Sequence, residues 1–263
     1  MNTTASTHTA QLPGEIPFAL TQPDGARLRG CFRDSGSELV GIYVHGFRSD
    51  CNGEKALAFA RHAHARGWSW LRFDMRGHGL SDGELGEQNI SKGLADLLAV
   101  FEYTQGRPVL LMASSMGGWL SLLASPRDPA RVRGMVLIAP AFNFVQERFA
   151  TLPAHVLSAW RRDGSMSFPD DYGNELYSVA FSTLADAEQY DVLNRPVELG
   201  MPVHIVHGEK DAIVPLAIVN RFIDNVRANR LILDVVPGGD HRLTDHIPLI
   251  KRHLDRVWQE IPS

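Results

Sequence analysis

Short apolar runs alternate with amphipathic stretches from about residue 14 to the end of the chain. Several runs are continuously apolar, such as residues 109–112 (Val-Leu-Leu-Met) and 135–138 (Met-Val-Leu-Ile). Runs of this kind are typical of strands that are buried on both faces of a parallel sheet. The pattern predicts eight strands, at Ile16–Leu20, Leu28–Arg33, Leu39–His45, Ser69–Asp74, Pro108–Ala113, Gly134–Ala139, Val203–His207 and Leu231–Val236.

Between most of these strands, apolar residues recur at helical spacing, as Leu94, Leu97 and Phe101 do. Alternating strands and helices imply a doubly wound α/β sheet. Only the turn Pro-Asp-Gly at residues 23–25 separates the first two strands, so we expect them to form an antiparallel hairpin at one edge. The predicted helices are Glu54–Arg66, Leu94–Tyr103, Leu216–Val226 and Ile247–Trp258.

The domain organisation follows from the same pattern. Residues 1–13 are polar and predict a disordered tail, and residues 14–263 predict one α/β domain. The segment 142–195 interrupts the alternation because it contains no convincing buried strand, and we interpret it as a helical insertion over the carboxyl ends of the strands, where ligands bind in open α/β sheets. The aromatic residues of this segment are equally compatible with part of the core and with the lining of a cavity for an acyl chain. Phe142, Phe144 and Trp119 are the candidate substrate-binding residues.

Composition narrows the class of protein. A chain of 263 residues that is 44% hydrophobic is long enough for one sizeable core. The formal net charge of −4 indicates no nucleic-acid partner. Two cysteines are too few for a disulfide framework and are compatible with a reducing compartment. The chain has no apolar segment of the length that a secretory signal or a transmembrane segment needs, and we expect a cytoplasmic protein.

The strongest chemical signal is Ala113-Ser114-Ser115-Met116-Gly117-Gly118, between a predicted strand and a helical pattern. A strand, a sharp turn and a helix form the setting of a nucleophile elbow, in which the nucleophile lies in a strained turn. The residues two before and two after the nucleophile must be small. Around Ser115 these are Ala113 and Gly117, whereas around Ser114 both would be methionine. Ser115 is therefore the predicted nucleophile, although alanine replaces the first glycine of the usual G-x-S-x-G pattern.

An attack by Ser115 on a carbonyl would create an oxyanion that needs backbone N–H donors. The N–H of Met116 lies at a helix N-terminus, where free N–H groups favour negative charge. The second donor is expected in the loop after the third strand, which reads His45-Gly46-Phe47. Gly46 lets the backbone approach a substrate, so the N–H of Phe47 is the predicted donor. We expect His45 to be structural.

A serine hydroxyl needs a base, and the chain has 11 histidines. In enzymes with a nucleophile elbow, the acid and then the histidine follow the serine along the chain. His241 lies in a loop directly after the eighth strand and is the predicted base. Asp211 lies in the loop after the seventh strand and is the predicted acid, with Glu209 as its rival. Asp240 is expected to brace the loop of His241.

Other chemistry is not indicated. No cluster has the spacing of metal ligands, and no glycine-rich nucleotide motif is present, so we expect no metal and no cofactor. In the segment 72–83, Asp74 and Arg76 are expected to brace loops, and His78 to make a loop contact.

Taken together, these motifs resemble the α/β-hydrolase superfamily. The resemblance rests on His45-Gly46-Phe47, on the segment 74–81, on the elbow, on His207-Gly208-x-x-Asp211-x-x-Val214-Pro215 and on Asp240-His241. A narrower resemblance, to the branch of palmitoyl-protein thioesterases and acyl-glucuronide esterases, rests on Asn52-Gly53-Glu54-Lys55-Ala56, Ser114-Ser115-Met116-Gly117-Gly118-Trp119-Leu120 and Asp240-His241-Arg242. It implies Ser115, Asp211 and His241 as the triad, a short helical lid, and hydrolysis of S-acyl or O-acyl groups.

The prediction is therefore a serine hydrolase that cleaves small-molecule carboxylic esters or thioesters through an acyl-enzyme. Two alternatives stay open at this point. The same triad serves carbon–carbon and peptide bond hydrolases, and some proteins use this fold for binding alone.

Overall fold

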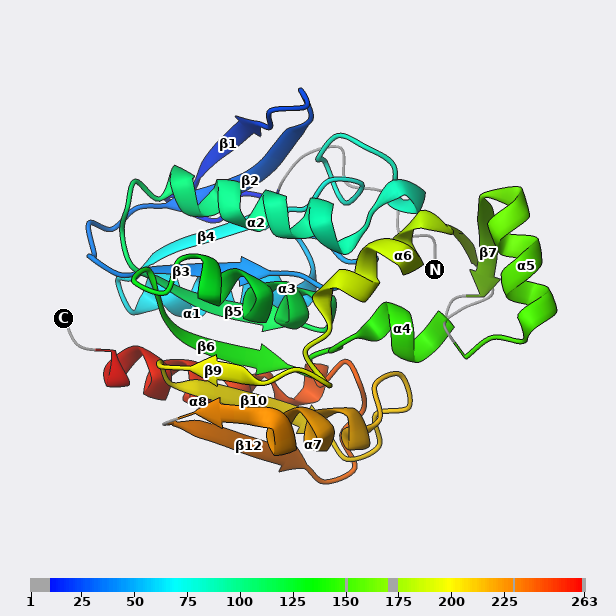
Figure 1. Cartoon of the computed structure of the whole chain (residues 1–263). Coiled ribbons are helices and arrows are strands. Elements are labelled where there is room, and N and C mark those ends of the chain that lie inside the picture. Colours follow the sequence, from blue (N-terminus) through cyan, green and yellow to red (C-terminus); the bar gives the residue numbers. More distant parts are fainter. Residues whose placement is uncertain (1–9, 150, 170–174, 229, 262–263) are drawn as a thin grey trace.

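A sheet of eight strands runs through the centre of the molecule in the order β1-β2-β4-β3-β5-β6-β10-β12 (Figure 1). The structure is a computed structural model, and it describes residues 10–149, 151–169, 175–228 and 230–261. The strands are β1 Ile16–Thr21, β2 Arg27–Arg33, β3 Val40–Val44, β4 Ser69–Asp74, β5 Val109–Ser114, β6 Val132–Ile138, β10 Val203–Gly208 and β12 Leu231–Val236. The fold predicted from the apolar runs is thus confirmed, with each of the eight predicted strands present.

The direction of the strands also follows the prediction. β2 pairs antiparallel with β1, from Ile16 opposite Phe32 to Thr21 opposite Arg27, and it pairs antiparallel with β4 as well. The other neighbouring pairs of the sheet, from β4 to β12, are parallel. The carboxyl ends of β3, β5, β10 and β12 therefore lie along one edge of the sheet, and the loops that follow these ends hold the predicted catalytic residues.

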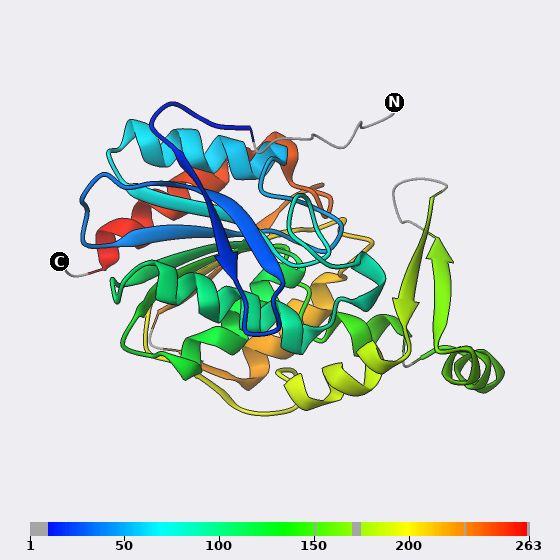
Figure 2. The same cartoon turned by 90° about the horizontal axis from the view of Figure 1, so that it is seen from above.

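Helices cover both faces of the sheet (Figures 1 and 2). One face packs against α2, α3 and α7, and the other against α1 and α8. These helices are α1 Glu54–Ala65, α2 Ile90–Tyr103, α3 Met116–Ala124, α7 Leu216–Asn225 and α8 Ile247–Glu260. α2 begins one turn before the predicted helix because the side chain of Asn89 accepts a hydrogen bond from Lys92 N at 2.8 Å and caps it. None of the helices in the described ranges has the length and apolarity that a membrane span requires.

The predicted insertion forms a lid that contains more than helices. Its elements are α4 Phe144–Phe149, α5 Ala154–Asp163, β7 Ser165–Pro169, β8 Leu176–Ala180 and α6 Ser182–Ala187. β7 and β8 form an antiparallel hairpin that, with α5, projects from the body of the molecule (Figure 2). The hairpin was not predicted because each strand buries only alternate residues, such as Phe168 and Tyr177, and so lacks a continuous apolar run.

A second small sheet joins β9 (Val197–Leu199) and β11 (Val226–Ala228) in parallel. At the N-terminus, residues 1–9 of the predicted tail lie outside the described residues. Residues 10–13 contact the body of the protein: Ala10 N donates to Asn52 Oδ1 at 3.0 Å, the Arg72 guanidinium donates to the Ala10 carbonyl, and Leu12 packs against a core cluster.

Candidate active site

Ser115 occupies the turn between β5 and α3 with φ 53° and ψ −122°. A non-glycine residue rarely adopts this conformation, and the surrounding backbone must hold it there. Ser115 N donates to Ile138 O at 2.9 Å, and Ser115 O accepts from Gly118 N at 2.9 Å and from Ala141 N at 3.1 Å. These hydrogen bonds to β6, α3 and the loop after β6 hold the backbone of Ser115 in its strained conformation. The strand, turn and helix have the form predicted for a nucleophile elbow.

Gly117 allows the first turn of α3 to touch the end of β3. A Cβ at this position would lie 2.3 Å from the carbonyl oxygen of Val44 and 2.5 Å from that of His45, which are distances that real Cβ atoms do not show. The requirement for a small residue two positions after Ser115 therefore has a direct steric cause.

We expect Gly117→Ala to lower the free energy of unfolding by about 1–3 kcal/mol, the usual cost of overpacking, because the added methyl group would meet rigid backbone. Denaturant unfolding followed by circular dichroism measures this. Gly200→Ala is the matched control, since a Cβ there has no neighbour within 4 Å among the described residues. Equal midpoints for the two variants would contradict the steric argument.

His241 lies between Ser115 and Asp211. Its Nδ1 is 2.7 Å from Asp211 Oδ2, and its Nε2 is 3.1 Å from Ser115 Oγ. A carboxylate can only accept, so Nδ1 carries the hydrogen and Nε2 presents its lone pair to the serine hydroxyl. Three residues separated by up to 126 positions in the sequence thus form the chain of contacts that a serine nucleophile needs.

The backbone and burial hold Asp211 in this orientation. Its side chain is fully buried, and its Oδ1 accepts hydrogen bonds from Ile213 N at 2.9 Å and Val214 N at 2.8 Å. His207 Nε2 donates to Val214 O at 2.9 Å and is 3.5 Å from Asp211 Oδ2. Oδ2 therefore remains directed at His241, and His207 braces the loop of the acid.

The loops of the acid and of the base pack directly against each other. A Cβ on Gly208 would lie 2.4 Å from Gly239 O, and Lys210 N donates to Gly239 O at 2.8 Å. The rival acid, Glu209, is exposed and accepts a hydrogen bond from Gly238 N at 2.8 Å. Asp240 accepts from Leu243 N at 2.8 Å and so braces the loop of the base, as expected.

His45 orients the peptide that contains the predicted second oxyanion donor. Met75 N donates to His45 Nε2 at 3.0 Å, so the hydrogen is on Nδ1, which donates to Gly46 O at 2.8 Å. Burial lowers the pKa of His45 to about 4, which keeps the ring neutral in this tautomer at neutral pH. Because a trans peptide directs its N–H opposite to its C=O, the Phe47 N–H points away from the His45 ring. A Cβ on Gly46 would lie 3.0 Å from Ser115 Cβ, so this loop borders the nucleophile.

The segment after β4 supports the same loop. His78 packs edge-on against Phe47, with ring centroids 5.9 Å apart, and its Nδ1 donates to Arg76 O at 3.1 Å. Burial lowers the pKa of His78 to about 3, so the ring is neutral. Asp74 accepts from Leu80 N at 3.0 Å, and Arg76 binds the buried carboxylate of Asp96, so both brace loops as expected.

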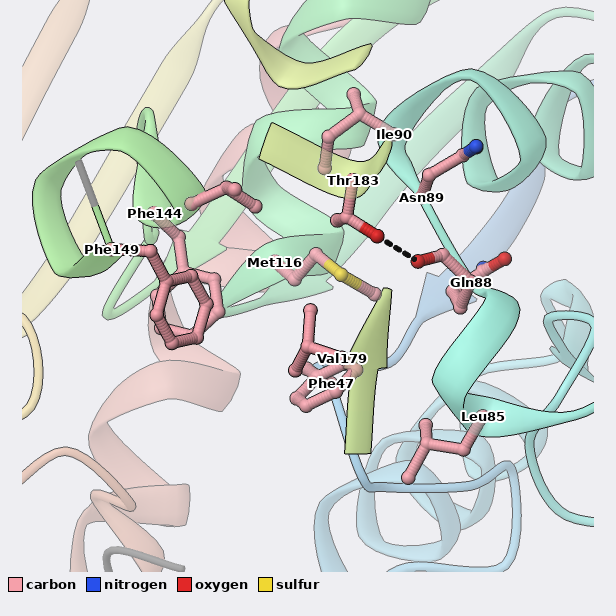
Figure 3. A pocket seen from close by; sticks show the side chains of 11 residues that line it. Phe47, Leu85, Gln88, Asn89, Ile90, Met116, Phe144, Phe149, Val179 and Thr183 are labelled. Carbon is pink, nitrogen blue, oxygen red and sulfur yellow. Dashed lines mark hydrogen bonds between the residues drawn. The ribbon is translucent and has the colours of Figure 1, made fainter. Parts of the chain in front are cut away.

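An apolar pocket extends from the predicted oxyanion residues into the lid (Figure 3). Met116 and Phe47 line it together with Phe149 and Val179, which come from the lid. None of the described residues that line it carries a charge. The lining residues are Phe47, Leu85, Gln88, Asn89, Ile90, Met116, Phe144, Val145, Phe149, Val179 and Thr183.

Of the three predicted substrate-binding residues, only Phe144 lines this pocket. Phe142 is 1% exposed and packs against Phe222 of α7, with ring centroids 4.3 Å apart. Trp119 is fully buried, and its indole Nε1 donates to Tyr190 O at 3.1 Å. The prediction for these two residues is thus corrected: both belong to the core, and Trp119 ties α3 to the end of the lid.

Within the described residues, no group of His, Cys, Asp and Glu side chains could hold a metal ion.

Comparison with known proteins places this geometry in a family. Residues 38–192 match the model of the family described as serine aminopeptidase, S33. The mitochondrial palmitoyl-protein thioesterase ABHD10 is 32% identical in Rattus norvegicus, over 78% of this chain and 69% of that protein, and 31% identical in Homo sapiens, over 78% and 67%. The solved structure of α/β-hydrolase domain-containing protein 10 from mouse superimposes with a TM-score of 0.85 at 27% identity, and the match covers 93% of this chain and 98% of that one. This chain therefore belongs to the α/β-hydrolase family of serine aminopeptidase S33 type, and it is a hydrolase that resembles the palmitoyl-protein thioesterase branch.

Proposed function

We propose that this protein hydrolyses long-chain acyl esters or thioesters through Ser115, His241 and Asp211. The observation that carries the proposal is the position of His241, within hydrogen-bond distance of both Ser115 Oγ and Asp211 Oδ2, beside an uncharged apolar pocket. The names of the ABHD10 relatives point to the same class of substrate.

In the proposed reaction, Ser115 Oγ attacks the acyl carbonyl while His241 Nε2 takes its proton. The tetrahedral oxyanion is held by the N–H groups of Phe47 and Met116, a contribution of about 3 kcal/mol for each donor. The imidazolium then protonates the leaving alcohol or thiol, which departs and leaves an ester on Ser115. Water, deprotonated by His241, attacks this acyl-enzyme, and the imidazolium returns the proton to Ser115 Oγ as the ester bond breaks and the carboxylic acid leaves.

The pocket supports a long apolar acyl group. Phe47 and Met116, the predicted oxyanion donors, line it together with Phe144 and Val179, so an acyl group whose carbonyl lies at these donors would meet apolar side chains (Figure 3). Each methylene group that moves from water into such a cavity gains about 0.8 kcal/mol. Binding energy from the chain would therefore rise with its length until the cavity is full.

An aminopeptidase is the second candidate, because the matching family model carries that description. An aminopeptidase must bind a substrate ammonium group, for which a carboxylate close to the nucleophile is the natural partner. The described residues that line the pocket include no carboxylate, and apart from Gln88, Asn89 and Thr183 they are apolar. The pocket therefore favours an acyl chain over a free amino terminus.

The test is a matched panel of p-nitrophenyl esters, acyl-thioesters and aminoacyl-p-nitroanilides. We expect kcat/KM to rise about fourfold per methylene in both acyl series, the equivalent of about 0.8 kcal/mol, and then to level off. Faster cleavage of the anilides than of any ester or thioester would overturn the proposal in favour of an aminopeptidase.

A cytoplasmic location remains a prediction, and the ABHD10 relatives are named as mitochondrial.

We expect Val179→Trp to shorten the preferred chain. Val179 lines the pocket from β8, and the larger side chain would fill the space that distal methylenes occupy. Long-chain substrates should lose at least tenfold in kcat/KM, whereas acetyl and butyryl substrates should change less than threefold. Leu176→Trp, on the same strand at an exposed position, is the control. A uniform loss across all chain lengths would show that the pocket does not hold the acyl chain.

A further inference from the structure

Lys55 lies in the first turn of α1, and its ammonium group contacts both sides of the proposed triad. Its Nζ donates to Ser114 Oγ at 3.0 Å and to the carbonyl oxygen of Arg242 at 2.9 Å. Ser114 directly precedes the nucleophile, and Arg242 directly follows the base. One side chain thus joins two segments that lie 59 and 187 residues away from it in the sequence.

The base loop also packs against the loop of the acid. Residues 208–210 pack against residues 236–240, so the acid and the base form one unit. Besides the contact between His241 and Ser115, the hydrogen bonds of Lys55 link the elbow strand and α1 to the base loop. Ser114 is buried, and the hydroxyl of buried Tyr43 is hydrogen-bonded to the Ser114 side chain, which restrains the anchor on the nucleophile side.

We propose that Lys55 is a positioning residue that sets the separation of Ser115 Oγ and His241 Nε2 by holding Ser114 and the Arg242 carbonyl at a fixed distance. This inference rests on the proposed function of the triad. It assigns to Lys55 no contact with substrate.

The charge of Lys55 strengthens both of its hydrogen bonds. Burial is the main reason that its pKa falls to about 8, and Arg242 lowers it further, while Asp240, Asp211 and Glu54 oppose the shift. Below this pH the ammonium group is charged, and hydrogen bonds from a charged donor are stronger than those from a neutral one.

Two substitutions of Lys55 test the link that it makes. Lys55→Met keeps most of the volume and removes the donors and the charge. We expect kcat to fall about 10- to 100-fold, the range that a small misplacement of reacting groups produces, with KM changed less than twofold. Lys55→Arg restores a charged donor and should recover most of the kcat of the wild type.

Ser114→Ala removes the acceptor of the hydrogen bond from Lys55 and leaves Lys55 in place. It provides a second test if Lys55→Met does not fold. Its loss of kcat should not multiply with that of Lys55→Met in the double variant, since both break one link. Lys251→Met, which removes one positive charge from α8, is the control and should leave kcat unchanged.

The outcomes separate this inference from the proposed function. A wild-type protein that cleaves neither esters nor thioesters refutes the proposed function itself. An active wild type whose Lys55→Met variant keeps kcat within twofold refutes the role of Lys55 alone. Losses of the Lys55→Met and Ser114→Ala variants that multiply would also overturn it.

Discussion

Replacement of Ser115 by alanine is expected to lower kcat for esters and thioesters on the order of 10⁶-fold, the loss found when a serine nucleophile of this type is removed. The reason is that Ser115 Oγ is the atom that would form the acyl bond, and its neighbour Ser114 points its Oγ to Lys55 instead. Steady-state kinetics and labelling with a fluorophosphonate probe measure the effect. The variant should bind substrate but show no label at position 115.

Ser158→Ala is the matched control because Ser158 is exposed on α5 of the lid. It should label and turn over like the wild type. Probe attached to the protein in Ser115→Ala, or turnover within 100-fold of the wild type, would show that another residue is the nucleophile. Unchanged thermal unfolding is expected, since Ser115 Oγ has no partner among the described residues other than the base.

Replacement of Asp211 by asparagine should lower kcat about 10⁴-fold while the fold remains intact. Asp211 Oδ1 accepts two backbone N–H groups, so the amide oxygen of the asparagine must take that side and its NH₂ group must face His241. His241 Nδ1 then becomes an acceptor, and its hydrogen moves to Nε2, which faces Ser115 Oγ. A ring that presents N–H to the hydroxyl cannot take its proton.

Glu209→Gln is the control from the same loop. Glu209 accepts the Gly238 N–H, which the amide oxygen of glutamine can also accept, so activity should stay within threefold of the wild type. If Glu209→Gln lost more activity than Asp211→Asn, the acid would be Glu209. A rate of Asp211→Asn within tenfold of the wild type would contradict the tautomer argument.

Local chemistry made most of the site predictable. Ser115 could be distinguished from Ser114 because a tight turn excludes large neighbours, and the contacts that a Cβ on Gly117 would make bear out that reason. His241 and Asp211 could be selected because the order of strands places the loops after β12 and β10 at the same edge as the elbow. These inferences depend only on backbone geometry and on strand order, which apolar runs reveal.

The residues that sequence reasoning misplaced are those whose environment is set by distant packing. An apolar residue on a helix gives the same pattern whether it faces a pocket or a core, so nothing local marked Trp119 as the partner of Tyr190, 71 residues away. Phe142, in the turn before α4, packs on Phe222 of α7, which lies 80 positions further along the chain. Lys55 lies in the segment 52–56, on which the narrower family resemblance rests. The residues next to it in the sequence nevertheless do not indicate its hydrogen bonds to Ser114 and Arg242.

By itself, the sequence determined the class of fold, the hairpin at its edge and the identity of the residues proposed for the chemistry, because apolar periodicity and turn sterics act over a few neighbouring residues. The tertiary structure alone decided the shape of the pocket, the hairpin in the lid and the bridge made by Lys55. These features depend on side chains from segments far apart in the chain, and their approach is an outcome of packing that no local pattern records.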